Sequence, residues 1–136
     1  MKPVPYFEDK MTVKFPAWDF DVKVILTGNV DASIHRRDPN HEDGSAHAAC
    51  LKNAASNPNC LIVLPYMPGA GTIAHESWHA VRQMLDYCGA NYENEVVAYH
   101  LGYLVNQITA FSLKFRKPKA GWPKRARPEP TRALDK

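Results

Sequence analysis

Residues 72–104 read TIAHESWHAVRQMLDYCGANYENEVVAYHLGYL, and this stretch predicts two consecutive helices. Thr72 is a suitable N-cap for the first helix, over residues 73–87, and Gly89 stands where a left-handed C-terminal cap is expected. Apolar side chains at helical spacing predict one packed stripe on this helix, made of Ala74, Trp78, Val81 and Leu85. The second helix is expected over about residues 92–115, with a buried stripe of Val97, Leu101, Leu104, Ile108 and Phe111.

Two strands are predicted upstream of the helices. In residues 19–27, Phe20, Val22, Val24 and Leu26 alternate with Asp21, Lys23 and Ile25, a pattern typical of a strand with one mainly buried face. Residues 61–67 form a short apolar run interrupted by Pro65, and we expect an edge strand because proline cannot donate to a ladder. The polar residues 28–56 predict a loop, with a short helix around residues 47–55. The fold class expected from this order is α+β.

The bulk composition is that of one folded domain. Apolar residues make up 45% of the 136 residues and charged residues 23%, close to the averages of globular proteins. No window approaches the roughly 20 apolar residues of a membrane helix, and the first residues lack the apolar stretch of a secretory signal. We therefore expect a cytoplasmic protein without membrane contact, whose cysteines Cys50, Cys60 and Cys88 are reduced. A bridge between Cys50 and Cys60 is the alternative if the protein is exported.

The net charge of +3 is unevenly distributed along the chain. Residues 114–136 carry nine Lys or Arg residues and two acidic ones, a net +7, which leaves −4 for the remainder. Their four prolines disfavour helix and strand, so we expect a domain over residues 1–116 and a basic, flexible tail over residues 117–136. Such charge runs are usually solvated, and nucleic-acid contact by this tail is the less favoured interpretation because interleaved aromatic residues are lacking.

His75, Glu76 and His79 form an H-E-x-x-H motif within the first predicted helix. Residues four apart project from the same helix face, so the two imidazoles can hold one ion. Zinc accepts histidine nitrogens, and a catalytic zinc keeps three protein ligands and leaves one position to water. Glu76 is then the natural general base. The competing interpretation is a pair of surface histidines on an ordinary amphipathic helix.

A third ligand is required for such a centre. The metzincin continuation needs glycine and histidine where this chain has Arg82 and Leu85, which leaves a glutamate from the second helix, as in gluzincins. Glu95 is preferred because its helix face carries small side chains that permit close helix approach, namely Ala98, Gly102 and Val105. Glu93 is the alternative, on a face with the bulkier Val97, His100 and Leu104.

Residues 72–104 resemble small phage-type, minigluzincin-like zinc metallopeptidases, whose motif helix is followed by a helix carrying E-x-x-A-Y, here residues 95–99. The resemblance implies a minimal zincin-like domain in which zinc is bound by His75, His79 and Glu95, and Glu76 is the catalyst. It also implies that residues 61–67 align the substrate, and an exposed strand edge favours an extended peptide or protein.

Three residues that follow Glu95 are candidates for stabilising the oxyanion, namely Tyr99, His100 and Tyr103. Two alternatives to the peptidase remain open. One is amide hydrolysis of a non-protein substrate such as a cell-wall peptide. The other is a catalytically silent zincin-scaffold protein that binds a host or partner protein.

Overall fold

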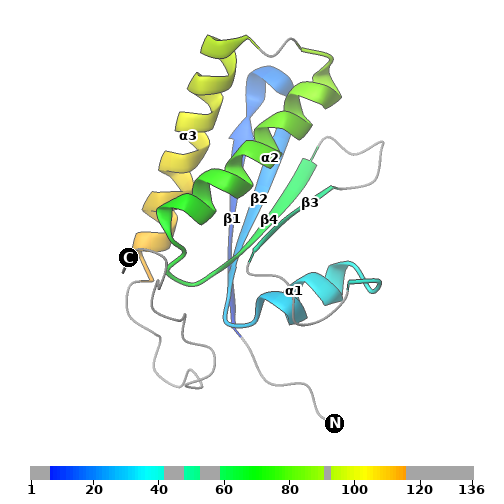
Figure 1. The fold of residues 1–136 in the computed structure, drawn as a ribbon, viewed down its shortest axis with the longest axis vertical. Helices are drawn as coiled ribbons and strands as arrows, with labels where there is room; N and C mark the ends of the chain where they lie inside the picture. Colours follow the sequence, from blue (N-terminus) through cyan, green and yellow to red (C-terminus); the bar gives the residue numbers. More distant parts are fainter. Residues whose placement is uncertain (1–6, 42–47, 53–58, 91–92, 116–136) are drawn as a thin grey trace.

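The computed structural model describes residues 7–41, 48–52, 59–90 and 93–115, which form an α+β fold (Figure 1). The predicted fold class is therefore confirmed. A small mixed sheet of four strands packs with three helices in these ranges. In chain order the elements are β1 (Glu8–Phe15), the 3-10 turn η1 (Pro16–Trp18), β2 (Phe20–Thr27), α1 (Val30–Arg37), β3 (Ala49–Lys52), β4 (Asn59–Pro65), α2 (Ala70–Cys88) and α3 (Asn94–Leu113).

The strand order of the sheet is β1-β2-β4-β3. β1 runs antiparallel to β2, β4 runs parallel to β2, and β3 runs antiparallel to β4. β4 therefore lies inside the sheet, and the prediction of an edge strand over residues 61–67 is wrong. Pro65 is tolerated because it is the last residue of β4, where a missing donor interrupts little of the ladder.

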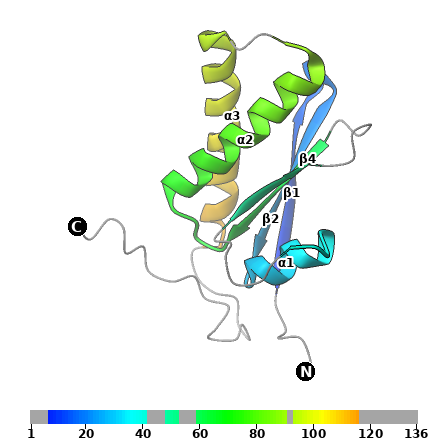
Figure 2. The same ribbon diagram turned by 45° about the vertical axis from the view of Figure 1, so that its right-hand side comes forward.

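The main core lies between the sheet and the pair α2 and α3, which cover the same face (Figure 2). The predicted inward residues of β2 are confirmed, since Phe20, Val22, Val24 and Leu26 are at most 3% exposed. The opposite face carries a smaller core, in which Ile34 of α1 packs against Ile25, Leu61 and Val63. β2 and β4 are thus buried on both faces only where α1 covers them.

Helix α2 differs from the prediction at its start and in its buried face. It begins at Ala70 behind the N-cap Gly69, so Thr72 lies inside the first turn. Its left-handed cap at Gly89 is confirmed, with φ 68° and a hydrogen bond from the Ala90 N–H to the Leu85 carbonyl at 2.9 Å. Ala74 and Trp78 are exposed, because the helix presents another set of residues to the sheet and α3: Ile73, Glu76, Ser77, Ala80, Val81, Met84 and Leu85.

Helix α3 matches the prediction more closely. Leu104, Ile108 and Phe111 are buried, and Val97 and Leu101 are partly buried against the same core. Its observed bounds, Asn94–Leu113, fall inside the predicted residues 92–115.

The segment predicted as a loop contains two regular elements. α1 is capped by the side chain of Asn29, whose Oδ1 accepts from the Ala32 N–H at 3.0 Å. Residues 49–52 form strand β3, so a short helix there is wrong, and residues 53–55 lie outside the described ranges. The predicted tail over residues 117–136 also lies outside them. Within the described ranges, no helix is long and apolar enough to cross a membrane.

Candidate metal centre

The H-E-x-x-H motif occupies the first half of α2, and its two histidines project from the helix face opposite the core. The side chain of His75 is 68% exposed, and His79 is exposed one turn later. Their Nε2 atoms are 3.2 Å apart and their ring centroids 4.8 Å apart. The helix therefore brings together the two imidazole nitrogens that the motif predicted.

This separation can be compared with the requirement of a zinc ion. Two nitrogens of a tetrahedral zinc site, each about 2.0–2.1 Å from the ion, lie about 3.3 Å apart. The observed distance between the His75 and His79 Nε2 atoms, 3.2 Å, agrees with that value. The same distance also suits a hydrogen bond in which one Nε2–H donates to the other nitrogen. The pair thus fits either a shared ion or a shared proton.

Glu76 lies beside the pair but is turned into the protein. The residue is 7% exposed, and its Oε1 lies 4.0 Å from Nε2 of His75. Burial raises the pKa of Glu76, and the opposing effect of the two neighbouring imidazoles does not cancel it. A carboxylate with a raised pKa is a stronger proton acceptor, which suits a general base.

The side of α2 that carries Glu76 faces the edge strand β3. Gln83 lies two turns after Glu76 on the same helix face, and its Nε2 donates to the Cys50 sulfur of β3 at 3.4 Å. β3 is the edge of the sheet nearest to α2, the position that the sequence pattern predicts for residues 61–67. Only four residues, ACLK, form this strand, too few for a periodic signal.

Cys50 and Cys60 lie on the same face of the β3–β4 pair. Cys50 is opposite Ile62 and Lys52 is opposite Cys60, so the two cysteines are diagonal neighbours. A hydrogen bond with Cys50 and burial raise the pKa of the Cys60 thiol well above its ordinary range. All three cysteines of the chain are free in this structure.

The structure does not bring the predicted third ligand to the histidine pair. Among the described residues, no group of three or more His, Cys, Asp or Glu side chains is arranged to hold a metal ion. Glu95 lies in the first turn of α3, Glu93 is its N-cap, and both are exposed.

The antiparallel course of the two helices explains this separation. α3 begins at the same end of the molecule at which α2 finishes, and the two helix ends are apart there (Figure 1). His79 lies nine residues before Cys88, toward the other end. Nine residues correspond to about 13 Å along a helix axis. The length of α2 after the motif therefore decides which residues of α3 lie level with His75 and His79.

The three candidates for oxyanion stabilisation lie toward the other side of the fold. His100 accepts a hydrogen bond from Trp18 Nε1 at 2.7 Å through Nε2, while its Nδ1 lies 2.7 Å from the Val96 carbonyl. These bonds describe a neutral imidazole with its proton on Nδ1. Tyr103 packs edge-on against Phe15 of β1 at 5.5 Å, and Tyr99 is 77% exposed. Since β1 is the edge strand opposite β3, their positions do not favour a role beside Glu76.

Comparison with known proteins identifies no relative of the chain. No protein-family model, no curated protein and no solved structure matches the chain.

Proposed function

We propose that the protein is a zinc-dependent hydrolase, and specifically a metallopeptidase, with His75 and His79 as metal ligands and Glu76 as the catalytic residue. The observation that carries the proposal is the 3.2 Å separation of the His75 and His79 Nε2 atoms. The proposal rests also on the H-E-x-x-H sequence, which combines metal ligands with an acid–base residue in five positions.

The role proposed for Glu76 follows from its position and protonation. A zinc ion at the two imidazoles would supply Lewis-acid activation of water and of the scissile carbonyl. Glu76 accepts a proton from the attacking water and delivers it to the leaving amine. Burial supports this role, because a raised pKa makes the carboxylate a better base and the resulting acid a better donor within the same cycle.

The third protein ligand remains part of the proposal. Glu95 is the preferred residue and Glu93 the alternative, on the sequence pattern alone. Either assignment requires the first turn of α3 to approach the exposed face of α2, because these glutamates do not join the histidine pair in the described structure. If neither glutamate binds zinc, the roles proposed for His75, His79 and Glu76 still stand.

The proposed substrate is a peptide or protein in an extended conformation. The edge strand β3 leaves one row of backbone groups without a partner strand among the described residues, and such a row can pair with an extended chain. Contact between β3 and α2 through Cys50 and Gln83 would place this chain along the helix side that carries Glu76. The zincin-like architecture remains a proposal as well, and the order of β3, β4 and α2 is compatible with it.

The second candidate function is a zincin-scaffold protein that binds a partner without turnover. The absence of a third metal-binding side chain beside His75 and His79, within the described residues, favours this alternative. Two imidazoles bind an ion more weakly than a complete three-ligand site, and a binding protein does not require tight metal loading.

Cleavage assays with a matched control distinguish the two functions. The zinc-loaded protein is incubated with a mixed peptide library, and products are identified by mass spectrometry. The peptidase proposal predicts cleavage by the wild type, none by Glu76→Gln, and equal zinc content in both. Zinc binding without cleavage of any peptide would favour the binding protein, whereas equal cleavage by Glu76→Gln would contradict the assigned role of Glu76.

A further inference from the structure

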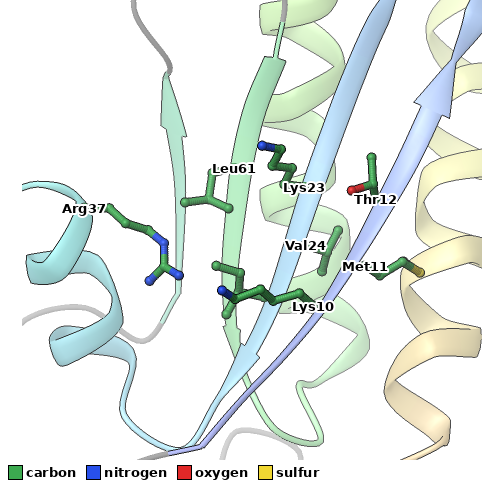
Figure 3. Close-up of a pocket in the computed structure, with 8 residues that line it drawn as sticks. Lys10, Met11, Thr12, Lys23, Val24, Arg37 and Leu61 are labelled. Atoms are coloured by element: carbon green, nitrogen blue, oxygen red, sulfur yellow. The ribbon is translucent and has the colours of Figure 1, made fainter.

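A pocket of about 500 Å³ opens on the sheet face that is opposite α2 and α3 (Figure 3). Its walls include Lys10 and Thr12 of β1, Lys23 and Ile25 of β2, Leu61 of β4 and Arg37 of α1. α1 packs over one end of this face, and the pocket lies beside Arg37, the last residue of α1. Sites for small molecules commonly have volumes of about 300–1,000 Å³, so the size is that of a metabolite site.

Three cationic side chains converge on the pocket from different elements. Lys10 is opposite Ile25 and Thr12 is opposite Lys23, so the two lysines are diagonal neighbours on one face of the β1–β2 pair. Figure 3 shows the nitrogen ends of Lys10 and Arg37 pointing toward each other, with Lys23 further along β2. Like charges that line one pocket repel one another, and a bound anion would reduce that repulsion.

Glu8 offsets only part of this positive charge. Its carboxylate accepts two hydrogen bonds from Arg37, at 2.9 and 3.0 Å, and one from Ser33 at 2.6 Å. Nζ of Lys10 lies farther from this carboxylate, 3.9 Å from Glu8 Oε1, and the Lys10 side chain is 62% exposed. In the described part of the chain Lys23 forms no ion pair. The three cations that line the pocket and the Glu8 carboxylate sum to +2, and Arg36, at 3.9 Å from Glu8, adds a further positive charge beside them. The surrounding region, residues 1–113, has a net charge of −4.

Arg37 retains donors for a ligand. A guanidinium has five N–H groups, and three of them are used by the bonds to Glu8 and the Ser33 carbonyl. Among the described residues the remaining two have no acceptor, and the bidentate bond to Glu8 holds the group in a fixed orientation. Ile25 and Leu61 line the floor beside it but are only 3% and 9% exposed, so a ligand would meet little of their surface. The aliphatic stems of Lys10 and Lys23 line the same pocket.

We propose that this pocket binds a small organic dianion, a phosphate monoester that carries an apolar or aryl group. The local charge matches a dianion, and Lys10, Lys23 and Arg37 supply the donors that a phosphate requires. The aliphatic stems of Lys10 and Lys23 and the small exposed part of Leu61 supply a surface for the attached apolar group, which inorganic phosphate would leave unused. The site is separate from the proposed metal centre, because α2 lies on the opposite face of the sheet.

Calorimetric titration of the full chain with phenyl phosphate tests this assignment. We expect a dissociation constant below about 1 mM, and binding at least fivefold weaker in Lys23→Met and Lys10→Met. Lys14→Met is the matched control, because Lys14 lies on the same face of β1 but outside the pocket. Thermal unfolding of each variant verifies folding, and Lys23→Gln and Lys10→Gln replace any variant that unfolds.

Comparison ligands identify the chemistry that is recognised. Inorganic phosphate is expected to bind more weakly than phenyl phosphate, and uncharged benzyl alcohol is expected not to bind. The proposal is overturned if phenyl phosphate does not bind, if the lysine variants bind like Lys14→Met, or if inorganic phosphate binds equally well. A short oligonucleotide that binds more tightly than phenyl phosphate, with steep salt dependence, would instead identify a nucleic-acid surface.

Discussion

Oε1 of Glu76 lies 4.0 Å from Nε2 of His75, although the glutamate is buried and the imidazole is exposed. This arrangement places an acid–base residue inside the protein and the candidate metal ligands at its surface. Burial raises the pKa of Glu76 in the folded protein above its value in the unfolded chain. The folded state therefore binds a proton more tightly, and the free energy of unfolding decreases as the pH rises through the unfolded pKa toward the folded pKa.

Glu76→Gln is expected to stabilise the metal-free protein near neutral pH, because it removes a buried charge while keeping the side-chain shape. The gain should shrink as the pH falls below the ordinary pKa of glutamate, where the wild-type side chain is also neutral. Urea unfolding at a series of pH values measures it. A gain that does not vary with pH, or a loss at neutral pH, would show that the buried charge of Glu76 does not destabilise the folded protein.

Glu8 should show the opposite pH dependence. Burial tends to raise its pKa, but the hydrogen bonds from Arg37 and Ser33 and the charge of Arg37 outweigh it, so the pKa is lowered. Its contribution is present above the unfolded pKa and is lost as the pH falls through the folded pKa. Glu8→Gln is expected to reduce the free energy of unfolding by about 2 kcal/mol near neutral pH, and by less in acid. An unchanged stability near neutral pH would contradict the role of Glu8 in fixing α1 to β1.

Ser77 occupies a variable position of the motif and is completely buried, and its hydroxyl has no hydrogen-bond partner within the part of the chain that the structure describes. Ser77→Ala removes this uncompensated group and improves helix propensity, so a gain of about 1 kcal/mol in the free energy of unfolding is expected. Chemical denaturation measures the change, with zinc binding as the control that should not alter. A loss of stability would indicate that the hydroxyl has a partner inside the folded protein.

Trp18→Phe should separate the structural role of His100 from any role in catalysis. The variant removes the N–H that donates to His100 Nε2 at 2.7 Å and leaves this partly buried acceptor without that bond. A loss of about 1–2 kcal/mol in the free energy of unfolding is expected, without a change in zinc affinity. A weaker zinc affinity at unchanged stability would instead connect His100 with the metal centre.

Periodic patterns predicted the elements that pack into the main core. β2 and α3 each bury mainly one face in this core, so the spacing of their apolar residues along the sequence indicates both the element and its buried face. α1 was missed because its few apolar residues, among them Ile34, contact the sheet only in a small second core. Pro65 favours an edge position for β4 only if it lies within the strand, and the sequence does not show that the strand ends at this residue.

The part of the candidate site that depends on local spacing was predictable from the sequence, and the part that depends on packing between elements was not. His75, Glu76 and His79 lie within one helix, where spacing alone fixes which side chains are neighbours. Glu95 depends on how two helices pack, and helix lengths and the connection between them determine that packing. Gln83 and Cys50 meet through a strand pairing that a four-residue segment could not indicate.

Zinc affinity of the purified full chain, measured by competition with a coloured chelator, tests the central claim most directly. The variants are His75→Ala and His79→Ala, with His35→Ala as a control for an exposed histidine on another helix. Glu95→Ala and Glu93→Ala are measured in parallel and identify the third ligand without affecting the test of the pair. The account predicts one zinc per chain in the wild type and in His35→Ala, and at least about tenfold weaker binding when either motif histidine is replaced. No zinc binding by the wild type, or wild-type affinity in His79→Ala, would contradict it.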